Sequence, residues 1–135
     1  MRLTAFRVGA AAWTVTGLVH DALELALPGD PELEAAMRAA SVQLGPVSLE
    51  AAALYRGLSL AMGLAMIVAG VLLWMIARAF RTEPERARPF GFVALAGSAA
   101  VLALAAFMIP GPPLVTFGVA TAAFAVALAP RRAAR

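Results

Sequence analysis

Two ionisable side chains near the end of the first apolar segment have a spacing that suits acid–base chemistry. His20 and Glu24 are four residues apart, so a helix places them on one face, where a carboxylate can orient an imidazole for proton transfer. Such a pair suits isomerisation or cyclisation of a sterol-like or isoprenoid substrate, which is protonated at one carbon and deprotonated at another. His20 and Glu24 are therefore the candidate catalytic residues.

The helix expected around this pair has one face that is unlike the rest. At about 100° per residue, a set of small, aromatic and polar residues falls within about 80° of arc, and the opposite side is apolar. The set is Gly9, Trp13, Thr16, Gly17, His20 and Glu24. In lipid, small residues permit close helix contact and polar ones join helices by hydrogen bonds. This face is therefore predicted to point toward other helices.

A second apolar segment begins on the side where the first one ends, and Arg56 lies near that beginning. An arginine in hydrocarbon is costly unless it reaches water or a partner, so we expect Glu24 or Asp21 to pair with it. The predicted polar cluster consists of His20, Asp21, Glu24, Tyr55 and Arg56. The candidate ligand-binding residues are Trp13, Thr16, Asp21, Tyr55, Arg56 and Ser59.

Three interpretations of this cluster remain open. It is an ion pair that fixes helix register, the polar end of an apolar ligand pocket, or an acid–base site. Metal binding is disfavoured because His20 and Asp21 point about 100° apart on a helix and Arg56 competes for the carboxylates. The chain has no cysteine and one histidine, so we predict neither a metal nor a cofactor.

The composition is that of a membrane protein. Of the 135 residues, 62% are apolar and 14% are charged, against about half and a quarter in a soluble domain. This excludes a disordered chain and an ordinary cytosolic enzyme. All eleven basic residues are arginines that flank apolar segments instead of forming a basic face, so no nucleic-acid partner is expected.

Four segments are apolar enough to be predicted as membrane spans: about 4–26, 50–78, 90–109 and 112–129. A spanning helix needs about 20 residues, but the uncharged part of the first segment, 8–19, is shorter. That span must therefore include Arg7 and the cluster from His20 to Glu24. The sequence predicts an all-α, four-transmembrane-helix bundle that forms a single domain, 1–135.

The arginines predict the orientation of the bundle. They precede the first span, crowd the connection between the second and third, and follow the last. The nine arginines at these places are Arg2, Arg7, Arg78, Arg81, Arg86, Arg88, Arg131, Arg132 and Arg135. Arginine-rich segments stay cytoplasmic, so both termini are expected inside the cell inner (plasma) membrane.

The first outer loop, 28–46, is predicted to contain a short amphipathic helix. Asp30 is a suitable N-cap and Pro31 suits the first helical position. Apolar residues recur at helical spacing, and Glu34 and Arg38 form an i,i+4 pair. The apolar residues are Leu33, Met37, Ala40 and Leu44, and Gly45-Pro46 ends the helix. The helix is either a connector packed on the bundle or a lid over a pocket.

The stretch Leu54-Tyr55-Arg56-Gly57-Leu58-Ser59-Leu60-Ala61-Met62-Gly63-Leu64 carries a resemblance. It resembles the start of the second helix in a group of small bacterial four-helix integral membrane proteins, where a Tyr-Arg-Gly-x-Ser-x-x-Met-Gly pattern occurs. Their first helix ends near a Gly-x-x-His like Gly17-Leu18-Val19-His20, and the chain is also distantly similar to DoxX-type membrane proteins. The resemblance implies that His20 and Arg56 belong to one arrangement; it brings no activity.

These features predict a protein of the lipid bilayer that binds a hydrophobic small molecule or lipid, or that packs as an accessory subunit against a larger membrane complex. The alternative is a cofactor-independent membrane enzyme that uses His20 and Glu24, with Arg56 as an anion or carboxylate partner. A purely structural subunit is the third class. The small-residue faces of the first two spans also allow a homo-oligomer.

Overall fold

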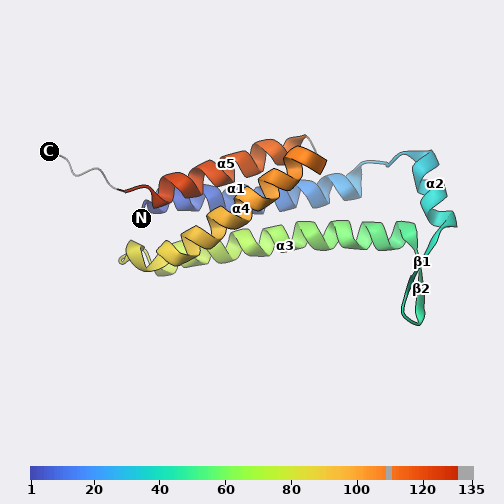
Figure 1. Cartoon of the computed structure of the whole chain (residues 1–135), viewed down its shortest axis with the longest axis horizontal. Coiled ribbons are helices and arrows are strands. Elements are labelled where there is room, and N and C mark those ends of the chain that lie inside the picture. The colour runs from blue at the N-terminus through green and yellow to red at the C-terminus, as the bar shows by residue number, and fades with distance from the viewer. Residues whose placement is uncertain (109–110, 131–135) are drawn as a thin grey trace. The chain divides into compact units, whose positions relative to one another are not determined.

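The computed structural model describes residues 1–108 and 111–130, and these are mostly helical (Figure 1). Its elements are α1 (Leu3–Ala26), α2 (Pro31–Ala39), β1 (Ser41–Leu44), β2 (Val47–Glu50), α3 (Ala51–Ala79), the 3-10 helix η1 (Pro84–Ala87), α4 (Arg88–Met108) and α5 (Pro112–Leu128). The four long segments predicted as helices are helices. Residues outside the described ranges are Ile109, Pro110 and the C-terminal segment with Arg131, Arg132 and Arg135.

The chain divides into two compact units. The first consists of Met1–Thr16 and Met66–Arg135, and the second of Gly17–Ala65. Helices α1 and α3 each contribute residues to both units.

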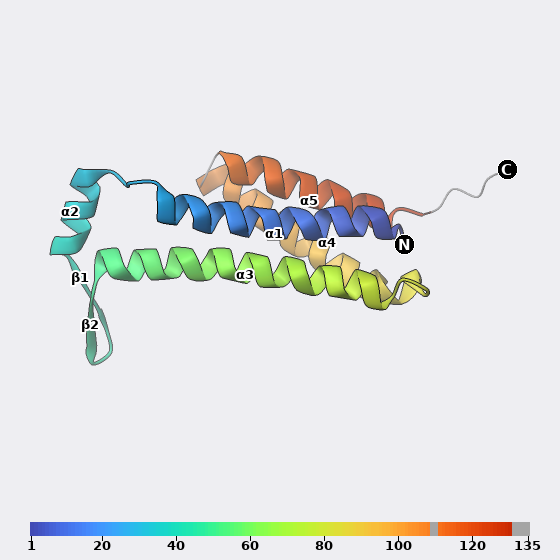
Figure 2. The ribbon, with the colours of Figure 1, turned by 180° about the vertical axis from the view of Figure 1, so that it is seen from behind.

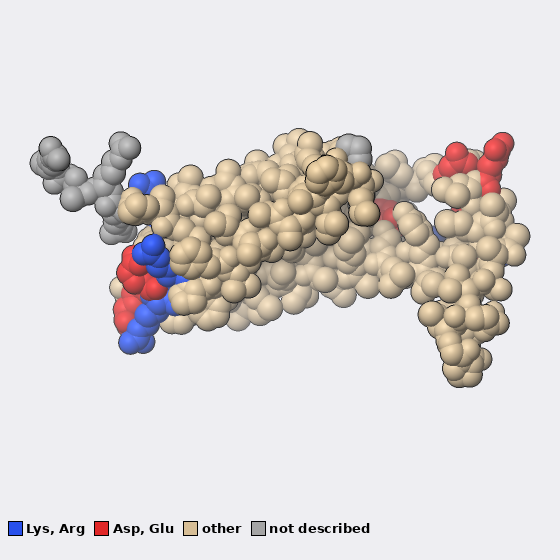
Figure 3. Space-filling model, viewed as in Figure 1, with Lys and Arg blue, Asp and Glu red and all other residues tan. Residues whose placement is uncertain are grey.

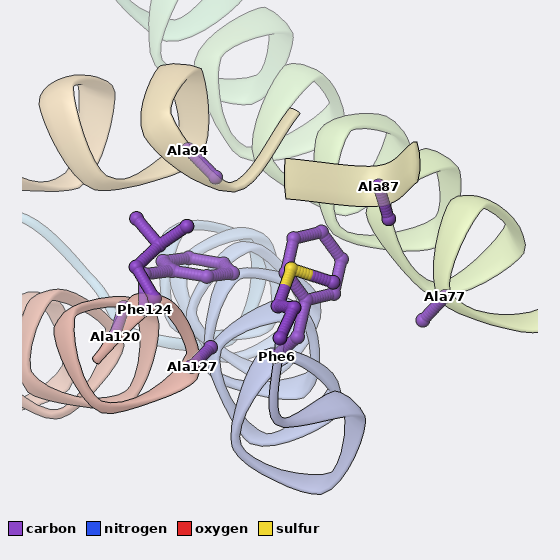
Figure 4. Packing of buried hydrophobic residues seen from close by; sticks show 9 residues of the cluster. Phe6, Ala77, Ala87, Ala94, Ala120, Phe124 and Ala127 are labelled. Carbon is purple, nitrogen blue, oxygen red and sulfur yellow. The ribbon is translucent and has the colours of Figure 1, made fainter. Parts of the chain in front are cut away.

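The core of the first unit is built from aromatic rings set among alanines. The rings of Phe6 and Phe124 meet edge to face, with their centroids 5.3 Å apart, and both side chains are fully buried. Figure 4 shows Phe124 between Ala94 and Ala120, with Phe6 beside it. Gly9 allows the backbone of α1 to come close to the Phe124 ring, since a Cβ on residue 9 would lie 2.6 Å from that ring. Small residues thus bring α1, α4 and α5 close together.

The second unit contains the short helix predicted between the first two long helices. Asp30 caps α2 as expected, accepting hydrogen bonds from the backbone N–H groups of Glu32 at 2.9 Å and Leu33 at 3.1 Å. Pro31 occupies the first helical position, and Glu34 and Arg38 form an ion pair. These predictions are confirmed.

The prediction that this helix continues to Leu44 is wrong. It ends at Ala39, and a two-stranded antiparallel hairpin follows, in which Val42 pairs with Leu49 and Leu44 with Val47. Gly45 and Pro46 form its two-residue loop, and Gly45 has a φ of 61°, which glycine adopts without strain. The alternation of polar and apolar residues in Ser41–Leu44 and Val47–Glu50 therefore prevails over the helical spacing. Figures 1 and 2 show the hairpin projecting to the side of α3.

Two helical stretches among the described residues are long and apolar enough to cross a membrane: Ala51–Ala79 and Pro84–Met108. Helix α5 is apolar but shorter. Helix α1 is long but less apolar, because Arg7 lies near one end and His20, Asp21 and Glu24 lie near the other. Figure 3 shows charged side chains gathered around η1, whereas the surface over α4 beyond its first turn has none on that face.

Candidate functional site

Polar side chains of α1 meet Ser59 of α3 inside the second unit. The His20 Nε2 atom lies 3.1 Å from Ser59 Oγ and 3.2 Å from the Ser59 carbonyl oxygen. The Ser59 hydroxyl in turn donates a hydrogen bond of 2.8 Å to Glu24 Oε2. Ser59 therefore bridges His20 and Glu24, the two residues whose spacing predicts an acid–base pair.

The direction of these hydrogen bonds follows from the single proton of the hydroxyl group. Because Ser59 donates that proton to Glu24, its Oγ and its carbonyl oxygen can only accept from His20. The Nε2 atom of His20 must then carry a hydrogen. The three side chains form a chain of donors and acceptors that runs from the imidazole to the carboxylate, and a proton can pass along it.

Asp21 lies against α3 one turn farther along, where Gly63 makes room for it. A Cβ on residue 63 would stand 1.8 Å from Asp21 Oδ1, so the carboxylate occupies the space that a side chain would fill. Asp21 Oδ1 is buried and has no hydrogen-bond partner among the described residues. A buried acceptor without a partner costs about 1–3 kcal/mol. Asp21 is thus the member of the cluster with a buried polar atom that lacks a partner within the described residues.

An open pocket of about 960 Å³ lies in the second unit between the end of α1, the helix α2 and the first turns of α3. Its wall combines charged, aromatic and apolar side chains, among them Glu24, Leu33, Met37, Arg38, Tyr55 and Arg56. Glu24 belongs both to this wall and to the series of hydrogen bonds that runs through Ser59. The pocket is therefore connected to His20 by hydrogen bonds.

Arg56 does not form the predicted ion pair. Within residues 1–108 and 111–130, neither Glu24 nor Asp21 lies within ion-pair distance of its guanidinium group. The partner of Glu24 is Ser59, which follows Arg56 by one helical turn. Arg56 lines the pocket instead, beside Tyr55, and both side chains are exposed.

Trp13 and Thr16 belong to the first unit and have structural contacts there. The Trp13 indole N–H donates to Ser98 Oγ at 2.8 Å, and its ring meets Phe117 edge to face at 5.1 Å. Thr16 donates to the carbonyl oxygen of Ala12 on its own helix at 2.6 Å. Neither residue lines the pocket.

Most residues of the pocket wall are not among the sequence candidates, and Arg38 and Glu50 are two of the charged ones. The sequence predicts only a pair with Glu34 for Arg38, which the structure contains, and no role for Glu50. A signal for Glu50 exists, since it is the charged residue directly before the apolar α3, at the same end of that helix as Arg56. Within the described ranges, no group of three or more histidine, cysteine or acidic residues is arranged to hold a metal ion.

Comparisons with protein-family models, with curated proteins and with solved structures find no match to this chain.

Proposed function

We propose that this chain is a multi-pass protein of a bacterial inner (plasma) membrane, with four helices crossing the bilayer and both termini in the cytoplasm. Its open pocket, on the outer side, binds a hydrophobic small molecule or lipid.

The exposure of the apolar helices supports a membrane environment. In the most apolar part of Ala51–Ala79 only 17% is buried, and in that of Pro84–Met108 only 22%. The core helix of a soluble protein is instead buried over most of its surface. On α4, Val93 is 73% exposed and Phe107 is 88% exposed. A continuous apolar surface of this kind is unfavourable in water and suits lipid.

The contacts of α1 explain how this less apolar helix can also cross the bilayer. His20 and Glu24 hydrogen-bond to Ser59, and Asp21 faces Gly63, so the polar groups of its last turns are directed at α3. At the other end, the Arg7 guanidinium lies 6.0 Å from the centre of the Trp74 ring, a cation–π contact. Ionisable groups that face a neighbouring helix are tolerated in a membrane.

The observation that carries the binding function is the composition of the pocket wall. Arg56 lacks an ion pair among the described residues, and it shares the wall with exposed leucines, including Leu25, Leu27 and Leu33. Small-molecule sites combine apolar walls with a few polar groups that orient the ligand.

Native mass spectrometry of the detergent-purified protein, combined with extraction of co-purified lipids, tests this function. Met37→Trp adds bulk to the pocket wall and is expected to remove a bound molecule. Ala35→Trp, on the same helix but outside the wall, is the matched control and is expected to retain it. An equal complement of bound molecules in both variants contradicts a site in this pocket. A stoichiometric partner protein with an empty pocket indicates an accessory subunit instead.

The hydrogen-bonded chain from His20 to Glu24 favours a second function, a cofactor-independent isomerase or cyclase acting on a sterol-like or isoprenoid substrate. In this function Glu24, which lines the pocket, exchanges protons with the bound substrate, and Ser59 passes protons between Glu24 and His20. Chromatography of the co-purified molecule after incubation with protein tests for a changed isomer. Turnover that persists unchanged in His20→Gln and Glu24→Gln excludes this function.

A further inference from the structure

The charged side chains of the pocket wall divide into those with partners and those without. Asp30 is used in capping α2, Glu34 pairs with Arg38, and Glu24 accepts the Ser59 hydroxyl. Glu50 and Arg56 also line the pocket. Neither forms an ion pair or a side-chain hydrogen bond within residues 1–108 and 111–130, and both are exposed. The pocket therefore presents one unpaired anion and one unpaired cation.

The remaining lining is largely apolar. Leu25 and Leu27 are each 62% exposed and Leu33 is 59% exposed, all at the pocket. Exposed leucines next to unpaired charges match a molecule with an apolar body and a charged head. A head of one sign would leave one of the two protein charges unpaired. A purely anionic head would also be repelled by the wall, where four carboxylates outnumber two arginines: Glu24, Asp30, Glu34 and Glu50 against Arg38 and Arg56.

We propose that the pocket binds a zwitterionic phospholipid whose headgroup carries a phosphate and a primary ammonium, with Arg56 holding the phosphate and Glu50 the ammonium. The planar guanidinium suits bidentate contact with phosphate oxygens, and the carboxylate accepts hydrogen bonds from the ammonium. The leucines contact the glycerol and the first methylenes of the acyl chains. This inference rests on the proposed function, because it names the ligand of the same pocket.

The test compares three phospholipids with identical acyl chains, which are titrated into the detergent-solubilised protein and counted by native mass spectrometry. They are phosphatidylethanolamine, phosphatidylcholine and phosphatidylglycerol. We expect phosphatidylethanolamine to bind about fivefold more tightly than phosphatidylglycerol, as expected for one additional exposed charge-assisted contact. Phosphatidylcholine lacks ammonium hydrogens and is expected to bind with intermediate affinity.

Variants separate the two charged contacts. Arg56→Gln is expected to weaken binding of all three lipids, because all three carry the phosphate. Glu50→Gln is expected to weaken only phosphatidylethanolamine and phosphatidylcholine and to leave phosphatidylglycerol unchanged or tighter. Glu32→Gln removes an acidic charge from α2 outside the pocket wall and is the matched control, with no expected change. Unfolding midpoints equal to that of the unsubstituted protein show that the variants are folded.

Each outcome has a defined meaning. Equal affinities for the three lipids, or a headgroup preference that Glu50→Gln leaves intact, overturn the zwitterion assignment while leaving lipid binding in place. No lipid adduct on the folded protein overturns the proposed function itself. Soluble glycerophosphoethanolamine, which lacks acyl chains, is expected not to displace the lipid at equal concentration; if it does, the ligand is a soluble headgroup and the lipid assignment is wrong.

Discussion

Ser59 occupies the position at which one hydroxyl group satisfies two ionisable residues of another helix. Its loss leaves Glu24 without its donor and His20 without one of its two acceptors. We expect Ser59→Ala to lower the free energy of unfolding by about 1–3 kcal/mol, the cost of an unsatisfied charged partner. Denaturation in mixed detergent micelles measures this change. Ser48→Ala, at an exposed position of β2, is the matched control and is expected to stay within about 0.5 kcal/mol.

The imidazole gives an independent measurement for the same substitution. In the unsubstituted protein, ¹⁵N chemical shifts of His20 are expected to show a hydrogen on Nε2, because Ser59 can only accept from it. An unchanged unfolding free energy together with unchanged His20 shifts in Ser59→Ala contradicts the bridge.

Gly63 and Gly57 lie on the same helix but differ in what surrounds them. A Cβ at residue 63 meets the Asp21 carboxylate at 1.8 Å, whereas a Cβ at residue 57 meets nothing within 4 Å. We expect Gly63→Ala to lower the unfolding free energy by about 1–3 kcal/mol through overpacking. Gly57→Ala is the control and is expected to be neutral or slightly stabilising, because alanine favours helix.

A double-mutant cycle identifies Asp21 as the cause of the Gly63 effect. In an Asp21→Ala background the clash is absent, so Gly63→Ala is expected to cost less by about 1 kcal/mol or more. Equal costs of Gly63→Ala in the two backgrounds contradict a direct Asp21–Gly63 contact.

The sequence predicted which residues of α1 act together but not their partner on α3. The spacing of His20 and Glu24 is sufficient to place both on one face, and both do meet one residue. Arg56 and Ser59 are three residues apart, about 4.5 Å along the helix axis, and both are suitable partners for a carboxylate. The choice between them depends on the axial offset of the two helices, which no local pattern encodes. For the same reason, the sequence could not predict that Trp13 bonds Ser98 on α4.

At the scale of elements, the hairpin shows that the spacing of apolar residues cannot distinguish a helix from a strand in a short segment. Leu33, Met37, Ala40 and Leu44 follow helical spacing, while Val42 and Leu44 also follow the alternation of a strand. Both periods fit so short a segment, and Gly45-Pro46 is compatible with a helix end or a hairpin turn. The four long helices were predictable because their apolar segments are much longer than a strand.

The strand register gives the hairpin one apolar face, formed by Val42, Leu44, Val47 and Leu49. Residues 41–49 contain no charge, and an isolated hairpin is marginally stable in water unless its apolar face is covered. Because β2 leads directly into α3 and the hairpin projects to its side (Figure 2), the proposed topology brings this face to the outer leaflet.

Tryptophan fluorescence tests this placement. We expect Leu44→Trp to emit at shorter wavelength in vesicles and to be quenched by brominated lipids, because the indole enters the interface. Gln43→Trp, on the polar face of the same strand, is the control and is expected to emit as in water. Both Trp13 and Trp74 are replaced by phenylalanine to provide a dark background. Equal quenching at residues 43 and 44 contradicts the insertion of one face.

At the scale of the whole chain, the arginines determine the proposed orientation. Arg78, Arg81, Arg86 and Arg88 lie in or beside the connection between α3 and α4, where ion pairs with Glu83 and Glu85 neutralise only part of the charge. Arginine-rich connections of this length remain on the cytoplasmic side. The loop around α2, with Asp30, Glu32 and Glu34, then faces outward.

Because the chain has no cysteine, single introduced cysteines report this topology without interference. We expect Glu32→Cys on α2 to react with a membrane-impermeant maleimide in intact cells, since its side chain is exposed in the outer loop. Thr82→Cys, beside the arginines and also exposed, is expected to react only after the membrane is permeabilised. Helix α3 lies between the two positions, so they face opposite sides of the membrane if α3 crosses it. A protein inserted with the opposite orientation would exchange the two labelling results. Labelling of both positions in intact cells contradicts an α3 that crosses the bilayer, and with it the assignment of the pocket to the outer leaflet.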